Sequence, residues 1–187
     1  MTDGTLKSID IPLSNVARML NTNEAQITRA LATGILGTPP ASTSVAKVPL
    51  FHIAALLVLQ DAEKVDVAGD RAKEIIPSIA GAAYIRLAQN ALRDGRWAPG
   101  RGSPARTSEL CSLLQSDRGI GILEKQLPCS PMPTKAFAGF SKTTSFTFDK
   151  WDEIAELDWP LKVISSASIS RRLDFAFPGK LFFTDSW

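Results

Sequence analysis

The sequence predicts an α+β protein with a mainly helical N-terminal half and a small mixed α/β C-terminal half, and three observations lead to this prediction. Apolar residues recur at helical spacing through most of residues 13–93. A stretch rich in Gly, Pro, Ser and Arg follows at residues 94–108. Beyond it, short alternating stretches typical of strands mix with helical ones. We therefore expect a first domain at residues 1–93, a linker at 94–108 and a second domain at 109–187.

Composition limits the protein classes that remain open. The chain has 187 residues, of which 44% are hydrophobic and 21% charged, as in ordinary globular proteins. It has no apolar run of about 18 residues, so we expect no membrane span. The N-terminal sequence lacks the pattern of a secretory signal, and we expect a cytoplasmic protein. The net charge of +2 neither requires nor excludes a nucleic-acid partner.

Two short helices are expected after a loose lead-in at residues 1–10. The first begins near Ser14, whose hydroxyl can cap it, and the second runs over residues 23–33. Between them, the sequence Asn-Thr-Asn at residues 21–23 favours a sharp turn, because Asn tolerates the left-handed conformation. Gly34 suits the end of the second helix. The positions expected to be buried in this pair are Val16, Ala17, Leu20, Ile27 and Leu31.

The same kinds of sequence signal predict the remaining helices, strands and loops. The three prolines of residues 37–49 predict a loop or a two-stranded wing. Residues 51–64 and 78–93 read as apolar helices, and a shorter helix at 66–76 is expected to break at Pro77. In the back half we expect a short helix at 108–115, a turn into a strand at 119–123, a strand at 145–148, a helix at 163–175 and a closing strand at 180–184.

The strongest functional signal is the pair of helices within residues 13–36. A packed first helix followed by a second helix with outward polar side chains suits the major groove of DNA, which admits one helix. Gln and Asn can pair with adenine edges, Arg with guanine, and hydroxyl or basic groups with phosphates. The candidate DNA contacts are Ser14, Asn15, Arg18, Asn23, Gln26, Thr28, Arg29, Thr33 and Lys47.

This segment resembles the helix-turn-helix of the MerR-like winged-helix superfamily, which includes excisionase-like phage proteins. The residues that carry the resemblance are Val-Ala-Arg-Met-Leu at 16–20, Gly-Ile-Leu at 34–36, the wing segment 37–49 and the apolar stretch from Phe51. The resemblance covers residues 9–80, and it implies a winged helix-turn-helix that binds double-stranded DNA. The family usually places aromatic and basic residues in the middle of the recognition helix, where this chain has Thr-Arg-Ala-Leu at residues 28–31, and the wing carries only Lys47.

Charge suggests modest DNA affinity for a single protomer. Residues 13–61 carry three basic and two acidic side chains, a net of +1. A homodimer would compensate, and so would phosphate contacts from a basic linker. The linker arginines considered for that role are Arg93, Arg96, Arg101 and Arg106.

The sequence argues against an enzyme. Its single histidine, His52, lies in an apolar stretch and reads as a packing residue without visible catalytic partners. Cys111 and Cys129 are too few for a zinc site or a disulfide scaffold. The acidic segment 151–160 reads as an exposed helix with Trp151 and Trp159 packed inward. We therefore expect no catalytic residues, no metal and no cofactor.

The functional prediction is a sequence-specific DNA-binding protein in transcriptional control, including control of phage or mobile-element genes. One alternative is an architectural, excisionase-like or DNA-packaging factor. Another is a protein–protein adaptor with a vestigial helix-turn-helix. The aromatic C-terminal region is expected to be mostly core, and any exposed members would form a dimer or partner surface. These aromatic residues are Phe175, Phe177, Phe182, Phe183 and Trp187.

Overall fold

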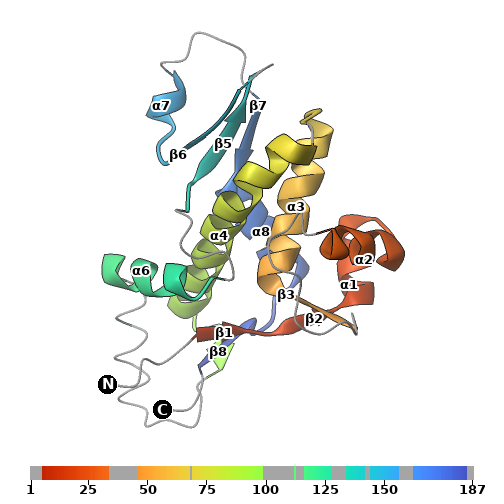
Figure 1. Cartoon of the computed structure of the whole chain (residues 1–187). Helices are drawn as coiled ribbons and strands as arrows, with labels where there is room; N and C mark the ends of the chain where they lie inside the picture. The colour runs from red at the N-terminus through yellow and green to blue at the C-terminus, as the bar shows by residue number, and fades with distance from the viewer. Residues whose placement is uncertain are drawn as a thin grey trace.

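The structure is a computed structural model, and it describes residues 6–33, 46–67, 69–98, 112, 116–127, 134–141, 144–155 and 162–184. Within these residues the fold is α+β, as the sequence predicted. Figure 1 shows α3 (Leu50–Lys64) and α4 (Gly69–Arg93) at the centre. On one side of them lie α1 (Leu13–Leu20) and α2 (Glu24–Ala32), and on the other lies α6 (Asp117–Lys125).

Two small sheets join distant parts of the chain. The strand β2 (Asp10–Pro12) pairs antiparallel with β3 (Lys47–Pro49), which places Ile11 opposite Val48. The strand β1 (Leu6–Ser8) pairs antiparallel with β8 (Phe182–Thr184), and β4 (Trp97–Ala98) lies parallel on the other side of β8. The expected strand near the C-terminus is therefore confirmed. The loose lead-in predicted for residues 1–10 is wrong for residues 6–8, because β8 supplies their hydrogen-bond partners.

A third sheet packs against α4 through β5 and β6. Its central strand β5 (Phe137–Phe140) lies between β6 (Ser145–Phe148) and β7 (Lys162–Ser165), both antiparallel to it. The predicted strand at 145–148 is confirmed. The predicted helix at 163–175 begins later than expected, since β7 occupies its start and α8 (Ser166–Ala176) follows directly. Val163 and Ile164 are β-branched, and pairing with β5 suits such side chains.

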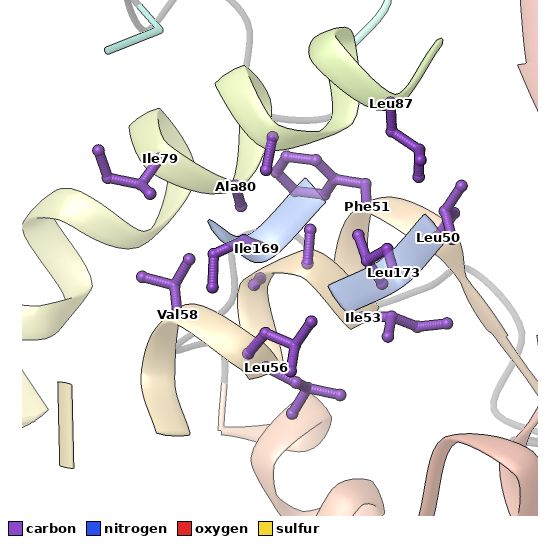
Figure 2. Packing of buried hydrophobic residues seen from close by; sticks show 14 of the residues in the cluster. Leu50, Phe51, Ile53, Leu56, Val58, Ile79, Ala80, Leu87, Ile169 and Leu173 are labelled. Carbon is purple, nitrogen blue, oxygen red and sulfur yellow. The ribbon is translucent and has the colours of Figure 1, made fainter. Parts of the chain in front are cut away.

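The hydrophobic core lies where α3, α4 and α8 meet. In Figure 2, Ile169 and Leu173 of α8 lie among side chains of α3 and α4, and neither is exposed to solvent. Every residue of α3 from Leu50 to Val58 is buried, because α3 packs against both α4 and α8. One continuous core thus includes residues from both halves of the chain. The boundary expected at residues 94–108 does not interrupt this core, and residues 99–108 lie outside the described residues.

Two local predictions are wrong. The helix α4 continues through Pro77, because Ile76 and Ile79 on either side of the proline are fully buried and hold both turns against the core. Residues 119–123 belong to the helix α6 and do not lead into a strand. Ser116 caps this helix, its Oγ accepting a hydrogen bond from the Gly119 N–H at 3.3 Å, and Leu123 is buried on its inner side.

Two aromatic residues expected in the core are exposed. Trp151, which precedes the short helix α7 (Asp152–Ala155), is 58% exposed and contacts the ring of Phe137 edge-on. Phe175 on α8 is 91% exposed, because the helix turns it away from α3 and α4. Phe182 is buried as predicted, whereas residues 156–160 and 185–187 lie outside the described part.

Candidate nucleic-acid interface

The candidate interface begins at α1, whose start differs from the prediction. Pro12 is the N-cap residue, and Ser14 lies exposed in the first turn without capping the helix. Pro12 has the non-helical backbone conformation of an N-cap residue, and its side chain has no group that could cap the helix. The Leu13 N–H donates to the carbonyl of Ala46 at 3.0 Å, so the start of α1 is tied to the residue that precedes β3.

The turn between α1 and α2 follows from two asparagines. Asn21 has a φ of 50°, in the left-handed region that Asn tolerates, and its N–H donates to the Arg18 carbonyl. Asn23 is extended, and its Oδ1 accepts a hydrogen bond from the Gln26 N–H at 2.9 Å. These contacts end α1 and start α2 within three residues, as the sequence predicted.

The apolar side of the helix pair packs as predicted. The five residues expected to be buried are all at most 6% exposed, namely Val16, Ala17, Leu20, Ile27 and Leu31. Gln60 of α3 fixes the end of α1, because its Nε2 donates to the Leu20 carbonyl at 2.9 Å. Gln60 also accepts from Arg172 of α8 at 3.0 Å, so a hydrogen-bonded chain connects α8 to the helix pair.

The polar side faces solvent. Of the nine candidate contacts, eight are exposed and Asn15 is half-buried. Some are engaged within their own helix. Asn23 is the cap of α2, Thr28 donates to the Glu24 carbonyl, and Thr33 donates to the Ala30 carbonyl, both at 2.9 Å. These three side chains are less available to a base edge than the sequence suggested.

The remaining candidate side chains make few contacts with the described part of the protein. Within the described residues Ser14, Arg29 and Lys47 make no side-chain hydrogen bond or ion pair, while Arg18 donates only to Asn15 at 3.2 Å. Gln26 is exposed next to Arg29 in α2, with the Thr22 hydroxyl against its side-chain oxygen. A free guanidinium beside a carboxamide on one helix is the combination that reads guanine and adenine edges.

Two further charged residues near the helix pair affect the expected DNA affinity, one unfavourably and one favourably. Glu24 is exposed in the first turn of α2, where it stabilises the helix but would repel phosphates. Arg171 of α8 is exposed and lies across a groove from Arg18 of α1. Sequence reasoning missed Arg171, although the adjacent pair Arg171–Arg172 within a predicted helix must point to different faces.

The linker arginines that the structure describes are already paired. Arg93 contacts the Asp94 carboxylate at 3.2 Å, and Arg96 contacts it at 3.1 Å and also binds Asp174 of α8. The hydrogen bond from Arg93 lowers the pKa of the Asp94 carboxyl, and the bond to Asp174 raises the pKa of Arg96. The predicted phosphate contacts from these two residues are therefore disfavoured. Arg101 and Arg106 lie outside the described residues, as do residues 37–45 of the expected wing.

In the part of the chain that the structure describes, the residues considered for catalysis or metal binding do not assemble a site. His52 is 4% exposed in α3 and packs edge-on against Phe51, as a core residue does. Among the residues that the structure describes, no three His, Cys, Asp or Glu side chains are grouped to hold a metal ion. Cys111 and Cys129 are outside that part of the chain. No described helix has both the length and the apolar character needed to cross a membrane.

Comparison with protein-family models, with curated proteins and with solved structures finds no match to this chain.

Proposed function

We propose that this chain is a sequence-specific DNA-binding protein that inserts α2 into the major groove. The observation that carries the proposal is the division of the α1–α2 pair into two sides. Its apolar side is buried against α3, whereas Gln26, Arg29 and the exposed face of α1 meet solvent. A helix held in this way can enter a groove without losing packing, and its free Arg29 would then contact a guanine edge.

The order of elements supports a winged arrangement. The strand β2 before the helix pair is hydrogen-bonded to β3, which leads into α3. The wing that the MerR-like resemblance implies, residues 37–49, would include β3 and the preceding part of the segment that joins α2 to β3. Lys47 is the first residue of β3, where it is exposed and would contact a phosphate.

We propose that the protein controls transcription as a homodimer. The low positive charge of one protomer favours a dimer. The helix pair carries only two basic side chains, Arg18 and Arg29, so one protomer would bind DNA weakly. Two protomers related by a two-fold axis would read half-sites about one helical turn apart, roughly 34–36 Å along the duplex. Binding as a dimer would multiply the affinity without any additional cation on each protomer.

The test is selection of duplexes from a random-sequence library by the full chain, followed by competition binding of the selected sites. The wild type is expected to enrich a motif with two inverted half-sites. Arg29→Ala should lose preference for one base position, at a cost of about 1–3 kcal/mol, because the guanidinium would no longer meet a guanine. Arg86→Ala is the matched control, since Arg86 is an exposed arginine of α4 that lines a different surface.

Retention of full sequence preference by Arg29→Ala would contradict the assignment of α2 as the reading helix. Recovery of all sequences alike, lost at higher salt, would indicate an architectural factor. Failure to recover any duplex would indicate the adaptor function.

A further inference from the structure

A groove of about 720 Å³ lies between α1 and α8. Asn15, Arg18 and Met19 line it from α1, and the face of α8 that carries Arg171 and Phe175 lines it opposite. The fully packed Leu57 of α3 forms part of its floor. The volume lies within the roughly 300–1,000 Å³ of small-molecule sites, and side chains from three helices converge on it.

The groove has an uncompensated positive charge. Three arginines line it, and no carboxylate does so among the residues that the structure describes. Arg172 is neutralised by Asp61, whose two oxygens both lie 2.8 Å from its Nη1. Arg18 donates only to the neutral Asn15. Arg171 makes no hydrogen bond or ion pair in the described part of the chain, so two guanidinium groups remain available to an anion.

The same groove exposes apolar surface. Met19, Leu57 and Phe177 line it, and Phe175 stands at 91% exposure beside them. Apolar residues that lie together in a groove mark a binding site, and the neighbouring cations specify the charge of a suitable ligand. A ligand that satisfies both properties has a flat apolar body and one anionic group.

We propose that this groove binds a small aromatic carboxylate. Its carboxylate would accept hydrogen bonds from Arg18 and Arg171, because the planar guanidinium fork matches the two carboxylate oxygens. Its ring would lie against Met19 and Leu57 and be covered by Phe175. Nothing in this binding step requires DNA.

The consequence for DNA binding rests on the proposed function. Asn15 and Arg18 are candidate phosphate contacts, and both also line the groove. A carboxylate held by Arg18 would neutralise a cation that the phosphates need. The ligand should therefore weaken DNA binding, and by linkage DNA should weaken ligand binding by the same factor.

The test uses 1-naphthoate as the probe in calorimetric titration of the full chain without DNA. The neutral 1-naphthalenemethanol and the cationic 1-naphthylmethylamine are controls with the same aromatic body and a different charge. The naphthoate is expected to bind at one site at least about tenfold more tightly than either control, since a charge-assisted pair contributes that much. Arg171→Gln should remove this preference, whereas Arg86→Gln should keep it.

Because Arg171 is exposed, its substitution should leave the fold intact, which circular dichroism would verify. Arg18→Gln provides a second variant with the same expected loss. The proposal is overturned by equal binding of the three probes, by no naphthoate binding up to about 1 mM, or by an unchanged preference in both variants.

The effect on DNA is measured separately by adding naphthoate to a complex with duplex DNA. Release of DNA by the wild type but not by Arg171→Gln would support the regulatory consequence. Naphthoate binding in a chain that binds no duplex would refute the proposed function and leave the ligand site standing. Duplex binding without naphthoate binding would refute the ligand site and leave the proposed function standing.

Discussion

Truncation of Leu173 tests whether the two halves of the chain fold together. Leu173 is fully buried on α8, where Figure 2 shows it among side chains of α3. Leu173→Ala removes three carbons, which at about 0.8 kcal/mol per buried CH₂ amounts to roughly 2.4 kcal/mol. A residual cavity adds to this, so we expect a loss of about 3 kcal/mol in the free energy of unfolding.

The assay is thermal unfolding followed by two signals. Far-UV circular dichroism reports mainly the long helices α3 and α4, whereas all four tryptophans lie at residue 97 or later. For a chain of this size, a loss of 3 kcal/mol should lower Tm by roughly 6–12 °C. We expect one transition, with both signals shifted equally, because α8 belongs to the shared core.

Phe175→Ala is the matched control on the same helix. Phe175 is 91% exposed, and its truncation should change stability by less than about 0.5 kcal/mol. Two separate transitions, with only the tryptophan signal shifted in Leu173→Ala, would refute the shared core. They would restore the independent C-terminal domain that the sequence suggested.

Two further predictions concern local packing and pH. Gly139→Ala should destabilise the chain by about 1–3 kcal/mol in urea unfolding, because its Cβ would lie 2.6 Å from Cζ of the buried Phe148. Gly69→Ala is the control, with no atom within 4 Å of its Cβ, and equal stabilities of the two variants would contradict the packing of β5. Burial raises the pKa of Tyr84 above its ordinary value of 10.0, so its stabilising contribution is complete below that pH and is lost as pH rises toward the folded-state pKa. Tyr84 is the sole tyrosine, so phenolate absorbance measures it directly, and a midpoint at or below 10 would be inconsistent with its burial.

Local signals predicted much of the front half. The spacing of apolar residues predicted α2 and α3 to within one residue at each end, and Asn21 and Asn23 predicted the turn. The buried face of the helix pair also followed from that spacing, because a short amphipathic helix has one way to bury its apolar side.

Contacts between distant residues account for the errors. The lead-in forms β1 only because β8, near the other end of the chain, pairs with it. Packing against α3 and α8 keeps α4 continuous through Pro77, against its intrinsic helix-breaking effect. Tertiary contacts of this kind have no signature in a local window of sequence.

Local sequence likewise predicted only part of the candidate site. The exposure of Gln26 and Arg29 was predictable from helical periodicity. The hydrogen bonds of Thr28 and Thr33 to their own helix depend on side-chain rotamers, which the sequence does not specify. Arg171 reaches the helix pair only because α8 packs on α3 beside it, so its place required the fold.

The most direct test of DNA binding by the α1–α2 surface is the salt dependence of affinity for duplex DNA. Four described cations near that surface are free of a carboxylate partner, namely Arg18, Arg29, Lys47 and Arg171. At about 0.9 per phosphate contact, log K should fall against log salt with a slope of roughly −3 to −4 for each protomer. Lys47→Ala should reduce the slope by about 1. No binding at about 50 mM salt, or a slope that Lys47→Ala leaves unchanged, would contradict the proposed DNA-binding surface.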